Sequence, residues 1–419
     1  MKDQVDTLVE NGIAASFISS ALSDHEAQRR VKEMEGGRYK IVYIAPERFQ
    51  SESFTDALKN IHIPFVAIDE AHCVSQWGHN FRPSYLKIKD LIQKIGNPVV
   101  AAFTATANER VQKDIISLLG LSQCRLFIGS FDRPNLEFRI EEPTDPDSYV
   151  LDYARSHKGK GGIVYASTRK KVENLYYFLR NNGIKAGMYH AGMTAEQRNR
   201  HQDSFINDNT PIMVATNAFG MGIDKSDVRY IIHYSMPMSM ESYYQEAGRA
   251  GRDGEKSVCI MIRNTDDYKL NKFILSGNYP PVKAVENLFK RVQKRKISGI
   301  PTELILSRKA AGSNIRESAL RKVMEYGYVH IRNGIVFPTD KDIFELTQEE
   351  IDKHKQEELA KLDTMNKYFE EETCLRSYIL KYFNQEPESE HCGNCSVCYR
   401  SEGKDSTLMS IMLSHIFGK

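Results

Sequence analysis

The chain has 419 residues, and at roughly 150 residues per domain this length predicts about three domains. Hydrophobic residues make up 41% of the chain and charged residues 27%, which excludes wholesale disorder and collagen-like repeats. No apolar run approaches the roughly 20 residues of a membrane span, and the first residues lead into no hydrophobic signal core. The net charge of +2 decides nothing about polyanionic partners, so any nucleic-acid surface must arise from local clustering of charge.

Up to about residue 275 the sequence alternates short apolar runs with longer amphipathic stretches. The runs are rich in β-branched residues and bounded by polar turns, which is typical of strands buried on both faces of a parallel sheet. They span residues 39–44, 65–68, 99–103, 163–165, 212–215 and 230–233. Between them lie helical patterns such as Lys170 to Asn181, in which Val172, Leu175 and Leu179 share one stripe. This alternation predicts an α/β fold.

The segment from Ile128 to Pro146 interrupts the alternation. It contains Asp-Arg-Pro and Pro-Thr-Asp-Pro, so it is predicted to be a linker. One α/β domain is therefore expected at residues 1–130 and a second at residues 131–277.

Residues 278–364 differ in character from what precedes them. Residues 282–332 hold twelve Lys and Arg against four Asp and Glu, whereas residues 333–373 hold five against twelve. In the basic part, a helical pattern from Ile315 to Glu325 precedes a hairpin pattern from Val329 to Phe337 with Asn-Gly at its turn. A winged-helix module and a solvated linker both explain these charges.

Two adjacent carboxylates, Asp69 and Glu70, end the apolar run 65–68 and precede Ala71-His72. Carboxylates beside a buried strand are costly unless a cation or a reaction requires them. One can hold the water shell of a magnesium ion while its neighbour polarises the water that attacks a terminal phosphate. Most Asp-Glu pairs lie on helix surfaces, but the preceding strand favours the catalytic interpretation here.

A second candidate group lies between Gln245 and Gly254, in the string QEAGRAGRDG. Arg249 and Arg252 are three residues apart among glycines, which predicts that they share one face of a short helix. Guanidinium groups placed in this way can hold phosphate oxygens and neutralise charge in a transition state. The alternative is an exposed basic turn.

Four of the seven cysteines are crowded near the end of the sequence, with the spacing Cys374-x17-Cys392-x2-Cys395-x2-Cys398. This crowding favours a metal over disulfide bridges. Four thiolates suit a tetrahedral zinc ion with no open position for catalysis, and an iron–sulfur cluster is the alternative. The other three, Cys73, Cys124 and Cys259, are interpreted as small buried hydrophobes.

Together these segments resemble the motifs of RecQ-type DNA helicases of superfamily two, and they occur in the family's order. The segments are residues 43–49 (YIAPERF), 69–72 (DEAH), 103–107 (FTATA), 214–224 (VATNAFGMGID) and 245–254. Residues 73–83 (CVSQWGHNFRP) resemble the family's aromatic-rich loop. With the cysteines included, the resemblance covers nearly the whole chain, and residues 282–364 are similar to an insertion in the short RecS-like bacterial branch.

The resemblance implies a fold and a division into domains. Two RecA-like parallel-sheet lobes are expected at residues 1–130 and 131–277, the first of them incomplete. A basic, mostly helical insertion, winged-helix-like in its pattern, is expected at 278–364, a zinc-binding subdomain at 365–400 and a tail at 401–419.

The resemblance also implies roles at the nucleotide, with ATP and Mg²⁺ as cofactors beside a structural Zn²⁺. Asp69 organises magnesium and Glu70 activates water, while His72, Thr104 and Thr106 relay the state of the nucleotide. Arg249 and Arg252, supported by Gln245, reach the nucleotide from the second lobe. Gly222 and Asp224 face it from the same lobe.

Contacts with DNA are implied at residues of both lobes. Trp77 is the only tryptophan, and it lies in a polar loop with Phe81 and Arg82, where stacking on an unpaired base suits a motor that reads no sequence. Core packing of Trp77 is the alternative. The remaining residues expected to meet the phosphate backbone are Pro46, Arg48, Thr168, Arg169, His190, Gly192 and Thr216.

The sequence contains no G-x-x-x-x-G-K-[ST] string, the loop whose amides and lysine hold nucleotide phosphates. The family places this loop upstream of the segment at which this sequence begins, so an N-terminally short chain is expected.

Two functions are therefore weighed: an ATP-dependent, 3′ to 5′ DNA helicase of repair and recombination, and a regulatory, DNA-binding zinc protein that no longer hydrolyses ATP. Intact Asp69, Glu70, Arg249 and Arg252 favour the first, and the absent loop favours the second. The expected partners are single-stranded and forked DNA and a single-strand-binding protein. A monomer without a membrane contact is expected, in the bacterial cytoplasm at the nucleoid.

Overall fold

The computed structural model describes residues 2–19, 22–76, 78, 81–121, 123–220, 225–306, 313–332, 334–401 and 403. Three predicted site residues, Trp77, Gly222 and Asp224, lie outside the described residues. The chain divides into two compact units. The first comprises Met1–Ile128, Lys322–Ile331 and Pro338–Asp342, and the second comprises Gly129–Arg321, Arg332–Phe337 and Ile343–Lys419.

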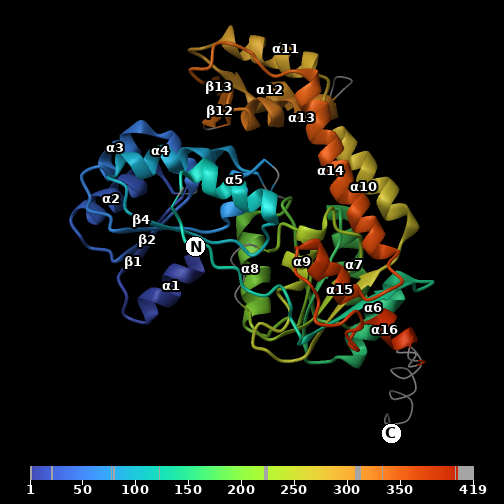
Figure 1. The fold of residues 1–419 in the computed structure, drawn as a ribbon. Helices are drawn as coiled ribbons and strands as arrows, with labels where there is room; N and C mark the ends of the chain where they lie inside the picture. The colour runs from blue at the N-terminus through green and yellow to red at the C-terminus, as the bar shows by residue number, and fades with distance from the viewer. Residues whose placement is uncertain are drawn as a thin grey trace. The chain divides into compact units, whose positions relative to one another are not determined.

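The first unit alternates helices with short parallel strands (Figure 1). Its elements are α1 (Lys2–Glu10), β1 (Ala15–Ile18), α2 (Asp24–Glu35), β2 (Ile41–Ile44), η1 (Pro46–Gln50), α3 (Glu52–Leu58), β3 (Phe65–Ile68), η2 (Ala71–Val74), η3 (Pro83–Leu86), α4 (Lys87–Lys94), β4 (Val99–Ala102) and α5 (Glu109–Leu119). β1 pairs with β2, and β3 pairs with β4, so that Phe65 lies opposite Val99.

Strands β2, β3 and β4 lie where the apolar runs predict them, but they are less buried than predicted, and β1 lies where no run was predicted. Phe65 is 52% exposed and Val99 is 69% exposed, whereas Ile68 is buried. Among the described residues each of these strands pairs with one neighbour, so each strand lies at the edge of a two-stranded sheet and part of each apolar run is exposed. Burial on both faces is therefore wrong for these strands.

The second unit contains a six-stranded parallel sheet in the order β5-β10-β9-β6-β8-β7. Its elements are β5 (Leu136–Glu141), α6 (Pro146–Ser156), β6 (Gly161–Tyr165), α7 (Arg169–Asn181), β7 (Ala186–Tyr189), α8 (Ala195–Ile206), β8 (Ile212–Ala215), β9 (Val228–His233), α9 (Met240–Ala247), β10 (Ser257–Ile262) and α10 (Thr265–Gly277). The predicted linker is wrong in its middle, because β5 pairs along its length with β10.

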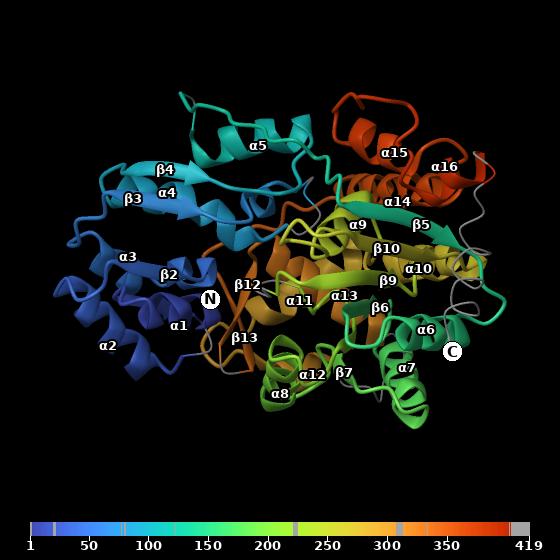
Figure 2. The ribbon, with the colours of Figure 1, turned by 90° about the horizontal axis from the view of Figure 1, so that it is seen from below.

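Alternate residues of this sheet enter two different cores, as the period of two along a strand requires. Val164 and Ile232 face α6 and α7, where Val172 and Leu179 complete an apolar cluster. Ile163 and other residues of opposite parity face α9 and the C-terminal helices. Figure 2 shows α14 and α15 on one side of the strands and α6 and α7 on the other. The sheet is therefore buried on both faces, as its continuous apolar runs predict.

The remaining elements are mostly helical. They are α11 (Val282–Gln293), β11 (Ile300–Pro301), α12 (Thr302–Leu306), α13 (Ser313–Glu325), β12 (Val329–Arg332), β13 (Ile335–Pro338), α14 (Gln348–Phe369), α15 (Leu375–Tyr382) and α16 (Ser396–Ser401). A helix and two strands thus lie where a helix and a hairpin are predicted. Helices α10 and α14 lie side by side (Figures 1 and 2). In the described part of the chain, no helix has the length and apolar character that a membrane crossing requires.

Candidate functional site

Asp69 and Glu70 follow the carboxyl end of β3 in the first unit. The backbone amide of Glu70 donates to the Asp69 carboxylate over 2.8 Å, and the Tyr85 hydroxyl donates to the Asp69 carbonyl over 3.1 Å. The Asp69 side chain is exposed, whereas Glu70 is half-buried. Ligand sites of parallel sheets lie at the carboxyl ends of the strands, so both carboxylates are in the expected place for a site.

Glu70 has an unusual backbone conformation for a residue with a side chain. Its φ of 49° and ψ of 43° lie in the left-handed region. A non-glycine residue held there costs about 1–3 kcal/mol, and such residues cluster at functional sites. This conformation ends β3 abruptly, and η2 begins at the next residue.

The predicted relay residues of the first unit form one hydrogen-bonded group. The Nδ1 atom of His72 lies 3.0 Å from the Thr104 hydroxyl and 3.3 Å from a carboxylate oxygen of Glu70. The Thr104 hydroxyl also accepts from the amide of Thr106 over 3.2 Å. His72 and Thr106 are buried. The segments after β3 and β4 are therefore joined beside Glu70.

Other predicted DNA contacts of the first unit lie in or beside η1 and η3. Pro46 begins η1, and the Arg48 side chain donates through Nε to the Ser19 carbonyl over 3.1 Å. Arg82 donates through its backbone amide to the Cys73 carbonyl over 2.9 Å, and Phe81 precedes it with a half-buried side chain.

Five predicted DNA contacts of the second unit lie together at the carboxyl ends of β6, β7 and β8. Thr168 caps α7, and its hydroxyl accepts from the amide of Lys171 over 3.2 Å. The amide of Gly192 donates to His190 over 3.2 Å, and a Cβ at Gly192 would lie 3.2 Å from Nη1 of Arg169. Thr216 donates through its amide to the Tyr189 carbonyl over 3.1 Å. Neighbouring strands of one parallel sheet place these residues side by side.

Arg249 and Arg252 do not share a helix face, contrary to the prediction. Helix α9 ends at Ala247, Gln245 lies within it, and turns follow. Arg249 is 7% exposed and donates to the Gly220 carbonyl, whereas Arg252 is exposed. Gly248 and Gly251 interrupt the helix, since glycine favours turns, and Gly251 has a φ of 55°. The Nε atom of Arg249 is buried without a hydrogen-bond acceptor among the described residues.

The four predicted metal ligands converge. One sulfur atom from each of Cys374, Cys392, Cys395 and Cys398 lies within 4.8 Å of the others. The sulfurs of Cys392 and Cys398 are 3.9 Å apart. Zn–S bonds of about 2.3 Å in a tetrahedron place sulfurs about 3.8 Å apart, so the geometry fits zinc.

The thiols of this cluster share hydrogen bonds with one another. Hydrogen bonds with Cys392 and Cys395 lower the pKa of Cys374, and the hydrogen bond with Cys374 raises the pKa of Cys392. Burial raises the pKa of Cys398 to about 11. Cysteine binds a metal as the thiolate, so binding of a metal by this cluster would release protons.

Three residues that no sequence motif indicated connect this cluster to strand β5 and the segment before it. The hydroxyl of Ser396 accepts from the backbone amide of Ile140 over 3.1 Å, and the side-chain Nδ2 of Asn394 donates to the Leu136 carbonyl over 3.2 Å. Arg376, two residues after Cys374, donates to the Arg133 carbonyl over 2.8 Å. Burial opposes its charge, but hydrogen bonds to Asp132 and Cys392 raise the pKa of the guanidinium. The position of Arg376, two residues after the first cysteine of the cluster, was the one sequence signal available.

Of the remaining cysteines, Cys73 and Cys259 are buried as predicted, and burial raises the pKa of Cys73 to about 11 and that of Cys259 to about 12. Cys124 is exposed, so the interpretation as a buried hydrophobe is wrong for it.

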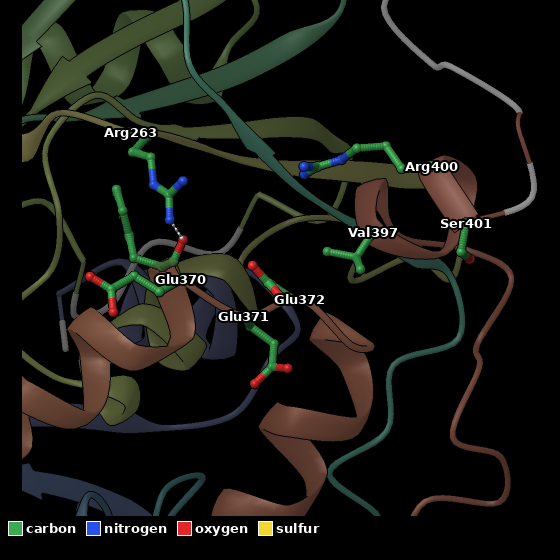
Figure 3. A pocket seen from close by; sticks show the side chains of 8 residues that line it. Arg263, Glu370, Glu371, Glu372, Val397, Arg400 and Ser401 are labelled. Carbon is green, nitrogen blue, oxygen red and sulfur yellow. Dashed lines mark hydrogen bonds between the residues drawn. The ribbon is translucent and has the colours of Figure 1, made fainter.

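A pocket of about 340 Å³ lies at the C-terminal end of α14 in the second unit (Figure 3). Arg263 donates to the Phe369 carbonyl there over 2.6 Å, beside Glu370, Glu371 and Glu372. Arg400 lines the opposite side. The predicted site residues do not line this pocket.

Comparison with protein families matches three parts of the chain. Residues 1–115 match the DEAD/DEAH box helicase model, residues 147–254 match the helicase conserved C-terminal domain, and residues 338–399 match the RecQ zinc-binding model. The chain is 32% identical to the probable ATP-dependent DNA helicase RecS of Bacillus subtilis, over 97% of this chain and 82% of RecS.

The ATP-dependent DNA helicase RecQ of Bacillus subtilis is 43% identical over 69% of this chain and 49% of its own length. The chain thus spans about half the length of that relative. Among solved structures, DUF1998 helicase MrfA bound to DNA and AMPPNP matches with a TM-score of 0.52 at 17% identity, over 83% of this chain and 53% of MrfA. Saccharomyces cerevisiae Dbp5 bound to RNA and ADP BeF3 matches with a TM-score of 0.50 at 16% identity, over 66% and 71%. These structural likenesses support the RecA-like lobes.

Proposed function

Because this chain belongs to the RecQ family of ATP-dependent DNA helicases, we propose that it is part of a motor that couples ATP hydrolysis to 3′ to 5′ movement on DNA. Its proposed substrates are single strands and forked duplexes, and a single-strand-binding protein is a proposed partner. The observation that carries the proposal is the group formed by Asp69, Glu70, His72 and Thr104 at the carboxyl ends of β3 and β4.

The proposed roles follow from the chemistry of each residue. Exposed Asp69 is available to a magnesium–water shell, and Glu70, held by its backbone at the end of β3, polarises the attacking water. His72 and Thr104 link Glu70 to the segment after β4. A change in the conformation of the segment after β3 therefore alters that of the segment after β4. Exposed Arg252 is the candidate for neutralising phosphate charge, because Arg249 is buried.

The proposed path for DNA includes the cluster of Thr168, Arg169, His190, Gly192 and Thr216. Two features support it. The cluster lies at the carboxyl ends of three parallel strands, where ligands of such sheets bind. Arg169 is exposed and can pair with a phosphate. Because Gly192 has no side chain, a phosphate can approach its backbone. Contacts of this kind are independent of sequence, as a motor requires.

The four-cysteine cluster is proposed to hold one structural zinc ion. When bound, zinc would tie α15 to the segment 392–398, and four thiolates leave no position for a reacting water. The cluster therefore has a structural role in the proposal.

For residues 1–419 by themselves we propose negligible ATP hydrolysis. The printed sequence contains no G-x-x-x-x-G-K-[ST] string, and that loop supplies most donors to the triphosphate. Asp69 and Glu70 are anionic and repel the triphosphate when no such donors offset their charge. A second candidate function is that of a DNA-binding zinc protein that does not hydrolyse ATP, which requires only the four-cysteine cluster and the proposed path for DNA.

Purified residues 1–419 test these proposals. We expect binding of labelled single-stranded DNA that weakens linearly with the logarithm of salt concentration, together with negligible DNA-stimulated ATP hydrolysis. Hydrolysis that Glu70→Gln abolishes would contradict the proposed inactivity. Joining the phosphate-loop segment of a RecQ-family helicase before Met1 tests the motor. The extended chain should unwind a 3′-tailed fork with ATP, and its Glu70→Gln variant should not.

If the extended chain hydrolyses ATP without a response to DNA, the DNA motor is contradicted. If it binds a fork but neither hydrolyses ATP nor unwinds, the second candidate function is favoured.

A further inference from the structure

The loop that carries Arg249 and Arg252 is held by a third arginine. The guanidinium of Arg133 donates to the carbonyls of Gly248, Ala250 and Gly251 at 3.3, 3.1 and 2.9 Å. These carbonyls lie on both sides of Arg249. Arg133 therefore fixes the path of the backbone from which Arg249 and Arg252 extend.

A neighbouring side chain also hydrogen-bonds to this loop. Asn135 donates to the carbonyls of Gly251 and Glu255 at 2.8 and 2.9 Å. A Cβ at Gly251 would lie 2.5 Å from Nδ2 of Asn135, so this backbone packs tightly against the segment before β5. The amides of the loop are also bonded, with Gly251 donating to Val228 over 2.9 Å.

The same segment before β5 is also held by Arg376 of α15. Its guanidinium donates to the Arg133 carbonyl over 2.8 Å and to Asp132 and the Leu136 carbonyl. Arg376 lies two residues after Cys374 in the chain, and its guanidinium lies over the Phe138 ring, 5.5 Å from its centroid. The helix that begins after Cys374 therefore carries the side chain that holds the backbone of Arg133.

We propose that Arg376 and Arg133 are positioning residues that couple the four-cysteine cluster to the loop bearing Arg249 and Arg252. The inference rests on the proposed function only for what those two arginines do. An ordered cluster holds Arg376, Arg376 holds the backbone of Arg133, and Arg133 holds the three loop carbonyls. Coupling between two sites is reciprocal, so a change in the loop also changes retention of metal by the cluster.

Both positions require the shape of arginine as well as its charge. A guanidinium presents five N–H donors in a planar fork, whereas a lysine ammonium is a compact point charge. A lysine at position 133 keeps the charge but cannot span three carbonyls. Arg133→Lys and Arg376→Lys therefore remove the coupling while they retain a cation at each position.

Hydrogen exchange of the zinc-loaded chain tests the proposal without ATP. The reporters are the bonded amides of residues 248–254, and the amides of β6 serve as the internal reference for global opening. Arg263→Lys is the matched control, because Arg263 lies in the same unit and donates to the Phe369 carbonyl instead of this loop. We expect Arg133→Lys and Arg376→Lys each to speed exchange of 248–254 about tenfold relative to the control, with β6 unchanged.

The second measurement is release of zinc to a chelating dye. Arg133→Lys should release zinc several-fold faster than Arg263→Lys although Arg133 has no bond to a cysteine, whereas a role confined to the loop would leave the release rate unchanged. Equal exchange at 248–254 in Arg133→Lys and the control overturns the proposal, and so does an unchanged rate of zinc release. Neither readout depends on hydrolysis, so these results are independent of whether the chain proves to be a helicase.

Discussion

The hydroxyl of Tyr368 donates to the hydroxyl of Tyr243 over 3.3 Å, and neither residue has any exposed surface. Tyr243 lies in α9, directly before the loop of Arg249, and Tyr368 lies near the end of α14. Two helices far apart in the sequence are therefore joined by a polar contact inside an apolar core that also contains Cys374 and Cys395.

Alkaline pH should destabilise the second unit. Burial raises the pKa of Tyr165, Tyr230, Tyr243 and Tyr368 above the value of about 10 for an exposed tyrosine. Above pH about 10 the unfolded chain loses phenolic protons that the folded unit retains. The contribution to stability is therefore complete below pH about 10 and falls by about 1.4 kcal/mol per pH unit for each such tyrosine above it. Urea unfolding at several pH values measures this, and a midpoint that does not fall would contradict it.

Replacing one member of the tyrosine pair should cost more than replacing both. Tyr368→Phe leaves the Tyr243 hydroxyl buried without its partner, which costs about 1–3 kcal/mol. Replacing both with Phe removes two polar groups from an apolar core and should be close to neutral. Denaturant midpoints of the two single variants and the double variant measure the coupling. A double variant as unstable as the sum of the singles would contradict the prediction.

The chain should bind one zinc ion through the four cysteines. Structural zinc contributes about 10–16 kcal/mol in small zinc modules, so Cys395→Ser should lose the metal and loosen the packing of α15 on β5. Cys124→Ser is the matched control, because Cys124 is exposed and lies outside the cluster. Metal analysis measures both variants. Iron with inorganic sulfide in the purified protein would favour an iron–sulfur cluster in place of zinc. Freely titratable thiols without metal would contradict both the zinc site and the iron–sulfur cluster.

Trp77 should contact single-stranded DNA. It lies outside the described residues, and as the only tryptophan it alone supplies the indole emission. We expect a change of emission at saturating single strands, and a loss of about 1–3 kcal/mol of binding free energy in Trp77→Ala. Trp77→Phe keeps a ring and should retain most of the affinity. Emission that is unchanged at saturation would count against the contact.

Local patterns were sufficient for many elements of the fold. The runs at residues 65–68 and 212–215 are β3 and β8 with the predicted bounds, and the stripe from Lys170 to Asn181 lies within α7. The period of two or 3.6 residues is a property of neighbouring residues, so the sequence shows it directly. The same holds for the four cysteines, whose spacing alone predicted that their sulfurs meet.

Strand β5 shows where local patterns fail. Its sequence, LEFRIE, lies between prolines and carries three charged residues, which led to the prediction of a linker. It is a strand because its backbone pairs with β10 and because Cys395 forms an isolated bridge with Phe138. Arg139 and Glu137 also pair with each other, which offsets the cost of charge within the strand.

The sequence by itself determined the alternating α/β plan, the ligands of the cysteine cluster and the order of the helicase motifs, because periodicity and spacing along the chain carry them. The tertiary structure alone decided that Arg249 is buried against Gly220 while Arg252 is exposed. It also decided that Arg376 bonds to Arg133, which lies 243 residues earlier. Such contacts depend on which carbonyls and cavities the packed sheet and helices bring together, and no local pattern of residues specifies them.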